Sequence, residues 1–311
     1  MRFDSRRASH PGPVATMRGR VRAASVDVSG PSVRGAAARW FGRCFYACGD
    51  EGPPRQISCL GVQYELKRVL KHDFVAATGL YEATHPRPDL PGKLIGKTNR
   101  RQHFCLVPLH WLGRLVTHKE VCNLRRCDGI REVPAVLARP HANTYVYAYI
   151  EGTDLGERPA LPQDLFDRLA AAVRQIHARN LVHFDLHKPG NILVDRAGRP
   201  HIIDFQLSLH LGDRCLLSRW LSTRFRRRLQ TYDIYHVYKH KRRLQPQLLT
   251  EAERQLSQDH SLPLRIHRAV AKPYKRIRRA CLRYLHAKGI LTGGGVTETH
   301  GETTPSRWAG N

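Results

Sequence analysis

The chain lacks several features that mark well-defined classes of protein. Its 311 residues include eight cysteines but no C-x-x-C pair, so the common zinc knuckles are excluded. Eight cysteines are also too few for a disulfide-stapled scaffold, so we expect reduced thiols in a cytoplasmic protein. No apolar run approaches the roughly 18 residues of a membrane-spanning helix, and the sequence predicts none. The N-terminal segment has no apolar centre and is therefore not a secretory signal.

Acidic residues are scarce compared with basic ones. The sequence has 26 Asp and Glu against 52 Lys and Arg, which gives a net charge of +26. Such an excess favours anionic partners, such as a nucleotide or an anionic membrane or lipopolysaccharide surface at the inner face of a membrane. A basic surface without a specific partner is the alternative. Nucleic-acid binding is disfavoured because no recognisable reader module accompanies the charge.

Composition divides the chain into four parts. Residues 1–55 are rich in Arg, Ala, Pro, Ser and Gly without a sustained period, which predicts a disordered basic leader. Residues 56–150 alternate strand-like runs with one helical pattern, and residues 151–290 are mostly helical. Residues 291–311 read as a disordered tail. Strands followed by helices predict an α+β fold with two segregated lobes.

Local patterns place the first elements. Residues 56–72 and 73–83 predict a two-stranded ribbon, and residues around 112–124 show helical spacing. Two strands are expected within residues 133–152, around the turn "PHAN". The clearest helix lies in residues 161–180, where one continuous apolar stripe contains Leu165, Phe166, Leu169, Ala172, Val173 and Ile176.

Three oxygen-bearing side chains stand beside strand-like runs in "HFDLHKPGNILVD" (residues 183–195) and "HIIDFQ" (residues 201–206). The runs "ILVD" and "HIID" fit a hairpin turned by "RAGR", which would bring Asn191 and Asp204 to one end of the paired strands. Magnesium requires hard oxygen ligands, and a carboxylate can orient a hydroxyl and accept its proton. The pattern therefore predicts magnesium-dependent phosphoryl transfer, with Asp185 as base and Asn191 and Asp204 as metal ligands.

These motifs resemble those of the protein kinase-like superfamily, and in particular its bacterial lipopolysaccharide kinase-like and aminoglycoside-phosphotransferase-like branch. Residues 183–185 resemble the H-R-D element and residues 204–206 resemble D-F-G, within a resemblance that covers roughly residues 57–245. The resemblance implies a two-lobed protein-kinase-like fold and ATP and Mg²⁺ as cofactors. It also implies transfer of the γ-phosphate to a hydroxyl of a protein, a saccharide or a lipid-linked saccharide.

The same resemblance implies roles for further residues. Glu120 is similar to the helix Glu that pairs with the nucleotide-binding Lys, and Asp233 is similar to the Asp that braces the catalytic loop. His183 supports that loop from within the H-x-D element. Lys188 lengthens the usual spacing before the metal-binding Asn by one residue, and it can reach toward a phosphate.

The nucleotide-binding Lys has two candidates, Lys93 and Lys97, in "KLIGKT". Because side chains alternate along a strand, both would face away from the side that Leu94 occupies. The pattern "LIGK" matches V-A-I-K and favours Lys97. A second alignment of the motif places Leu94 at the Lys position and indicates a weakened enzyme.

Two departures from the kinase pattern favour an alternative function. The glycine-rich loop is missing, and Gln206 stands in place of the Gly of D-F-G. The alternative is a pseudokinase that acts as a nucleotide-binding or membrane-binding module through its basic second half. Phe184 in place of the H-R-D Arg argues against control by a phosphorylated activation loop.

Overall fold

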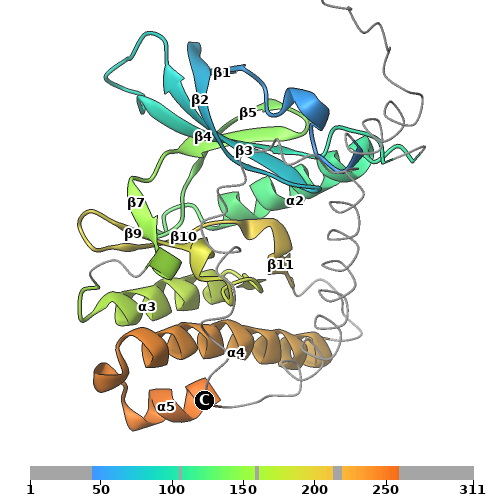
Figure 1. Ribbon diagram of the computed structural model, residues 1–311. Helices are drawn as coiled ribbons and strands as arrows, with labels where there is room; N and C mark the ends of the chain where they lie inside the picture. Colours follow the sequence, from blue (N-terminus) through green and yellow to red (C-terminus); the bar gives the residue numbers. More distant parts are fainter. Residues whose placement is uncertain (1–43, 105–106, 158–160, 213–218, 259–311) are drawn as a thin grey trace, which may run out of the picture.

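The computed structural model describes residues 44–104, 107–157, 161–212 and 219–258, which form an α+β fold with an antiparallel sheet. The sheet and helix α2 (His110–Arg126) lie at one end, and helices α3 (Leu165–Ala178), α4 (Arg219–Leu244) and α5 (Glu251–Gln258) lie at the other (Figure 1). The strands are β1 (Gln56–Cys59), β2 (Val62–His72), β3 (Ala76–Ala83), β4 (Lys93–Asn99), β5 (Val136–His141), β6 (Thr144–Ala148), β7 (Gly152–Asp154), β8 (Leu181–Val182), β9 (Ile192–Asp195), β10 (Pro200–Ile202) and β11 (Leu209–His210).

The first six strands form one sheet in the order β1-β2-β3-β4-β6-β5. The segment expected to be one long strand, residues 56–72, is two strands. Leu60 and Gly61 between them both have positive φ, 50° and 80°, and two successive positive φ values are the backbone of a tight hairpin turn. The two-stranded ribbon expected here is therefore a three-stranded meander, because an alternating pattern does not reveal a two-residue turn without the usual Asn-Gly pair.

Residues 44–55, which the sequence assigned to the leader, include residues that contact the sheet. Ala47 is fully buried, its amide donates to the Asp73 carbonyl at 2.8 Å, and its carbonyl accepts from the Arg101 amide at 2.8 Å. These bonds satisfy backbone groups that would otherwise remain unpaired at the end of the sheet. Residues 1–43 and the predicted tail at 291–311 lie outside the described residues.

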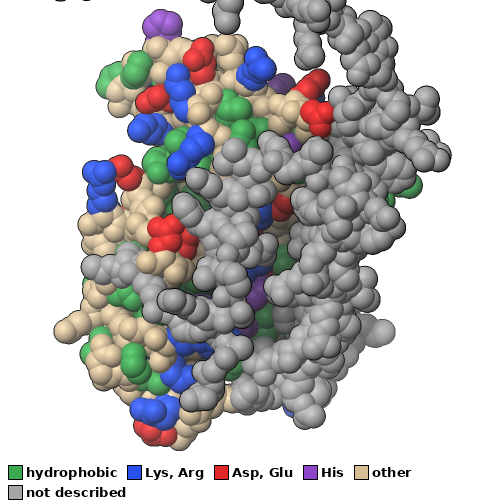
Figure 2. Space-filling model, viewed as in Figure 1, with side chains coloured by type: hydrophobic (Ala, Val, Ile, Leu, Met, Phe, Trp, Pro, Cys, Tyr) green, Lys and Arg blue, Asp and Glu red, His purple; other side chains and the backbone are tan. Residues whose placement is uncertain are grey.

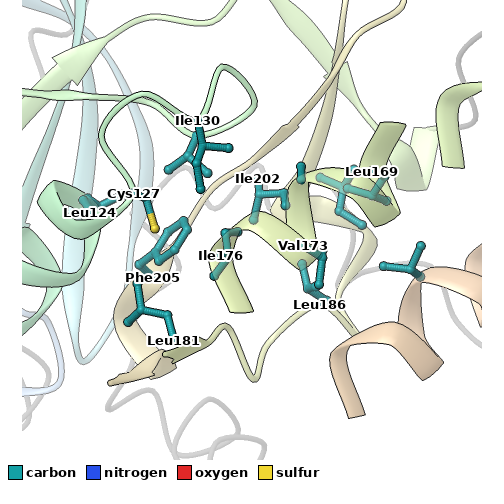
Figure 3. Close-up of a cluster of buried hydrophobic side chains, with 14 of the residues drawn as sticks. Leu124, Cys127, Ile130, Leu169, Val173, Ile176, Leu181, Leu186, Ile202 and Phe205 are labelled. Carbon is teal, nitrogen blue, oxygen red and sulfur yellow. The ribbon is translucent and has the colours of Figure 1, made fainter. Parts of the chain in front are cut away.

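Helix α3 confirms the predicted apolar stripe, since all six of its members are buried. They pack in a core that also includes Phe205, Ile202 and Leu186 from the segments that carry the chemical motifs (Figure 3). The small sheet β10-β9-β7 lies between this helix and the large sheet (Figure 1). The polar motif residues are therefore positioned by the apolar residues beside them.

Helix α2 forms where it was predicted, but only part of its predicted apolar stripe is buried. Leu112 and Leu115 are exposed, whereas Thr117, Glu120 and Asn123 are buried. The polar residues are buried because each has a partner in the structure, as when Asn123 Nδ2 donates to Ser208 Oγ at 2.9 Å. The helix thus docks through polar contacts as well as through the buried Val121 and Leu124, and hydrophobic periodicity detects only the apolar part.

Helix α4 packs along α3, and α5 packs against α4. Within the described residues, α4 is the helical basic segment predicted beyond residue 211, and residues 259–290 of the predicted large lobe lie outside them. None of the described helices combines the length and the apolar character that crossing a membrane requires.

Candidate active site

A buried ammonium group joins three separate segments of the chain. Lys97 Nζ on β4 donates to Glu120 Oε1 on α2 at 2.6 Å and to Asp204 Oδ1 at 2.7 Å. Asp204 follows β10, so the contact ties the sheet, helix α2 and the end of the β9–β10 hairpin together. A lone buried ammonium would be strongly unfavourable, and two carboxylate partners offset that cost.

The charges of this group are set by burial and by each other. Burial alone would lower the pKa of Lys97, but the Asp204 and Glu120 carboxylates raise it above its usual value. Burial raises the pKa of Glu120 against the opposing effect of the Lys97 ammonium. Burial would also raise the pKa of Asp204, but the Lys97 ammonium holds it well below its usual range. Asp204 is therefore ionised at neutral pH, as a cation ligand must be.

The other two candidate positions in "KLIGKT", Lys93 and Leu94, lie away from Glu120 and Asp204. Lys93 is exposed at the start of β4, opposite Glu82 of β3. Leu94 is fully buried on the opposite face, in an apolar cluster with Tyr81. The structure therefore brings Lys97 to Glu120 and Asp204 and leaves Lys93 and Leu94 apart from them.

A second cluster surrounds Asp185, which is almost completely buried. Lys188 Nζ donates to Asp185 Oδ2 at 2.8 Å, Asn191 Nδ2 donates to the same oxygen at 2.9 Å, and His187 Nδ1 lies 3.1 Å from Oδ1. Burial would raise the pKa of Asp185, but the His187 and Lys188 contacts hold it below its usual value. Asp185 is thus an ionised carboxylate whose Oδ2 is held by two hydrogen bonds.

The loop that carries Asp185 is anchored from α4. Asp233, fully buried, accepts from the backbone amides of His183 at 2.8 Å and Phe184 at 2.9 Å, and it lies 3.0 Å from His177 Nε2. Phe184 has a φ of 66°, a strained conformation for a residue with a side chain. The carboxylate of Asp233 holds the loop in this conformation.

His183 connects the same loop to the hairpin that precedes Asp204. Its Nε2 lies 3.1 Å from the Ile203 carbonyl, and its ring meets the Phe205 ring edge-on. The imidazole of His183 therefore helps to hold the loop against the residues after β10.

The β9–β10 hairpin forms as predicted and places Asn191 and Asp204 at the same end. Ile192 pairs with Ile202, and the Ile203 amide donates to the Asn191 carbonyl at 3.0 Å. Asp204 has a φ of 64°, so the backbone turns sharply after the strand. The paired strands thus carry the amide and the carboxylate to one edge.

The donor set suits a hard divalent cation. Asn191 directs its amide nitrogen at Asp185, so its Oδ1 faces another way, and Asp204 is an ionised carboxylate. One or two protein oxygens combined with phosphate oxygens are the usual environment of Mg²⁺. Within the described part of the chain, no three His, Cys, Asp or Glu side chains gather as a metal cluster of their own. The residues present therefore fit a magnesium ion that is bound together with phosphates.

Sequence reasoning missed a third ammonium group near Asp204. Lys71 on β2 helps to lower the pKa of Asp204, and so does Lys188. Its position depends on an irregularity in the pairing of β2 with β3, for which the sequence carries no signal.

Comparison with known proteins finds a partial similarity. No family model matches the chain. The chain is 30% identical over 148 residues to CBL-interacting protein kinase 1 of Oryza sativa subsp. japonica, a match that covers 39% of this chain and 32% of that protein. The matched part spans about a third of the length of that relative. The similarity supports a distant protein-kinase-like relationship for part of the chain.

Proposed function

We propose that the protein is an ATP- and Mg²⁺-dependent kinase-like phosphotransferase. The observation that carries the proposal is the Lys97 ammonium held between Glu120 and Asp204, within one structure that also holds the ionised carboxylate of Asp185. Phosphoryl transfer needs a fixed cation at the phosphates, a metal-binding carboxylate and a group that orients the acceptor. The partial similarity to a plant protein kinase supports the same reaction class.

In this proposal the charged residues near β4 bind the nucleotide. Lys97 contacts phosphate oxygens, and Glu120 keeps its ammonium positioned. Asn191 and Asp204 hold Mg²⁺, which neutralises charge on the phosphates when it is bound.

Asp185 orients the hydroxyl of the acceptor and accepts its proton. Its lowered pKa keeps it unprotonated, and Asn191 restricts its rotation through the 2.9 Å hydrogen bond. Lys188, whose side chain is 43% exposed, offers a cation beside the position of proton transfer. His183 and Asp233 support the loop and take no part in the transfer itself.

The proposal assigns the two halves of the fold to two lobes. Residues 56–150 correspond to a small lobe with the sheet and α2, and residues 151–290 correspond to a large lobe. The acceptor is a hydroxyl of a protein, a saccharide or a lipid-linked saccharide. The net charge of +26 favours anionic acceptors and a cytoplasmic location close to an anionic membrane or lipopolysaccharide surface.

One observation favours a second candidate, a pseudokinase that binds without transferring. The turn between β2 and β3 has no glycine, and Asp73 Oδ1 already accepts from the amides of Val75 at 2.8 Å and Ala76 at 2.9 Å. Those amides are therefore engaged before any phosphate arrives. On the described part of the face in Figure 2, Lys and Arg side chains occur over both the sheet and the helices, which would suit docking to an anionic surface.

Nucleotide-binding and transfer assays on matched variants test the proposal. Wild-type protein should show a Mg²⁺-dependent rise in melting temperature with ATP and should convert ATP to ADP. Asp185→Asn should keep the thermal shift and lose roughly 10²–10⁴-fold in turnover, the range for loss of a general base. Asp204→Asn should lose the Mg²⁺-dependent part of the shift. Lys93→Ala, an exposed change on the same strand as Lys97, is the matched control and should alter neither.

The two candidates give different outcomes. Turnover that survives both Asp185→Ala and Asp204→Ala contradicts the enzyme. A thermal shift with ATP but no turnover over a panel of hydroxyl acceptors supports the pseudokinase.

A further inference from the structure

Lys71 lies in a row of residues that crosses three adjacent strands. Lys71 of β2 pairs with Thr78 of β3, and Thr78 pairs with Lys97 of β4. Residues directly opposite one another on neighbouring antiparallel strands project from the same face of a sheet. Lys71 therefore projects from the face on which Lys97 meets Glu120 and Asp204.

An irregularity in β2 produces this orientation. The pairing shifts between Val69 and Lys71, so Leu70 is an extra residue in the strand. Such a bulge re-aims the side chains that follow it. The next residue, His72, turns to the other side, where its Nε2 accepts from the Cys48 amide at 3.2 Å and its ring lies 5.0 Å from the Tyr46 ring, tilted by 40°. The bulge thus leaves Lys71 on the opposite side of the strand from Tyr46 and Cys48, which pack against His72.

The ammonium of Lys71 has an exchangeable partner. Its Nζ lies 3.1 Å from Asp73 Oδ2, and its side chain is 46% exposed. Exposed ion pairs contribute little to stability, so replacing this carboxylate with a phosphate costs little. Lys97, in contrast, is buried between two carboxylates.

We propose that Lys71 is a phosphate-binding residue of the nucleotide site, and that its ammonium replaces the amide groups that a glycine-rich turn would supply. The inference rests on the proposed function. Lys97 Nζ lies 2.7 Å from Asp204 Oδ1, and Lys71 projects from the same face of the sheet, two strands away in the same row. Adjacent strands are about 4.8 Å apart, so the backbones at Lys71 and Lys97 are separated by only roughly 10 Å. One chain of phosphates can contact both ammonium groups.

Binding measurements on charge variants of the hairpin test this assignment. Dissociation constants for ATP, ADP and adenosine are measured by calorimetry in the presence of Mg²⁺. Lys71→Ala should weaken ATP binding about tenfold, as expected for one charge-assisted hydrogen bond, and leave adenosine binding unchanged. Lys67→Ala is the matched control, since Lys67 lies on the same strand, is 50% exposed and pairs with Glu65 at 3.4 Å. It should leave all three constants unchanged.

A change at Asp73 should act in the opposite direction. Asp73→Asn keeps an acceptor oxygen for the turn amides but removes the charge that competes for Lys71. ATP binding should tighten by roughly two- to fivefold, and the gain should disappear when Lys71→Ala is also present, because the two changes act on one interaction.

Three outcomes would overturn the inference. ATP affinity that is unchanged in Lys71→Ala but lost in Lys97→Ala removes Lys71 from the site while the proposed function stands. Equal losses of ATP and adenosine affinity make Lys71 a structural residue of the hairpin. Wild-type protein that binds none of the three ligands refutes the proposed function itself, and the role of Lys71 with it.

Discussion

The two charged clusters of the site are built in different ways. The sheet group, Lys97, Glu120 and Asp204, joins residues that are 23 and 107 positions apart in the chain. The loop group, Asp185, Lys188 and Asn191, joins residues that are only three and six positions apart. The short separations make the loop group readable from its motif, whereas the sheet group exists only because α2 and the β9–β10 hairpin dock against β4.

The comparison also shows where each group is vulnerable. The loop group is local in sequence, but its backbone is held by α4, through Asp233 at His183 and through His240 at Leu186. The sheet group is buried and depends on how closely α2 approaches the sheet. A group with local contacts can therefore still depend on distant support.

The largest expected effect comes from removing the support of the loop group. Asp233→Ala leaves the amides of His183 and Phe184 buried without an acceptor, so we expect a loss of roughly 3–5 kcal/mol in the free energy of unfolding. Urea denaturation measures it. Asp164→Ala, at a carboxylate that is 62% exposed beside α3, is the control and should lose less than about 1 kcal/mol. An equally small loss for Asp233→Ala would show that α4 does not hold the loop.

The second effect is a pH dependence of the support that α4 gives to the loop through His240. Burial lowers the pKa of His240 to about 4, against the opposing effect of the Leu186 carbonyl 2.9 Å from its Nε2. A folded-state pKa below the unfolded value means that His240 stabilises the fold above pH 6.5. This contribution is lost as pH falls from 6.5 through about 4, and it amounts to about 3 kcal/mol.

Unfolding free energies across this pH range, in wild type and in His240→Gln, isolate the contribution. The difference between the two proteins should shrink as the solution is acidified, because Gln does not titrate but can still donate to Leu186. A difference that is independent of pH between 4 and 6.5 would contradict the assignment.

A smaller effect is expected from separating α2 from the sheet. A Cβ at Gly113 would collide with the Arg100 carbonyl oxygen, a backbone atom that cannot move aside. Gly113→Ala should therefore cost roughly 1–3 kcal/mol and weaken nucleotide binding, because α2 also carries Glu120. Thermal melting with and without ATP and Mg²⁺ measures both. Gly92→Ala, where a Cβ would meet no atom within 4 Å, is the control, and a matching result for the two variants would refute this account.

The smallest stability effect is expected within the loop group itself. The Lys188 side chain is 43% exposed, so Lys188→Ala should change the free energy of unfolding by less than about 1 kcal/mol. Turnover should nevertheless fall, because the cation beside Asp185 is lost. Urea denaturation and ADP formation are measured on the same preparation. A stability loss that matches Asp233→Ala would indicate a structural residue.

By itself, the sequence determined the elements whose information is local. The apolar stripe of α3, the β9–β10 hairpin and the close grouping around Asp185 follow from spacings of a few residues. Short-range geometry is set by the backbone period, so a pattern is enough to predict it.

Only the tertiary structure showed which lysine meets Glu120 and Asp204, which face of α2 is buried and which residues before residue 56 contact the sheet. Lys93 and Lys97 share one face of one strand, and only the docking of α2 and of the segment after β10 distinguishes them. The position of Lys71 also depends on tertiary structure, because it follows a bulge in the pairing of β2 with β3. Contacts between distant segments depend on how whole elements pack, and the packing free energy is summed over many residues that no single motif contains.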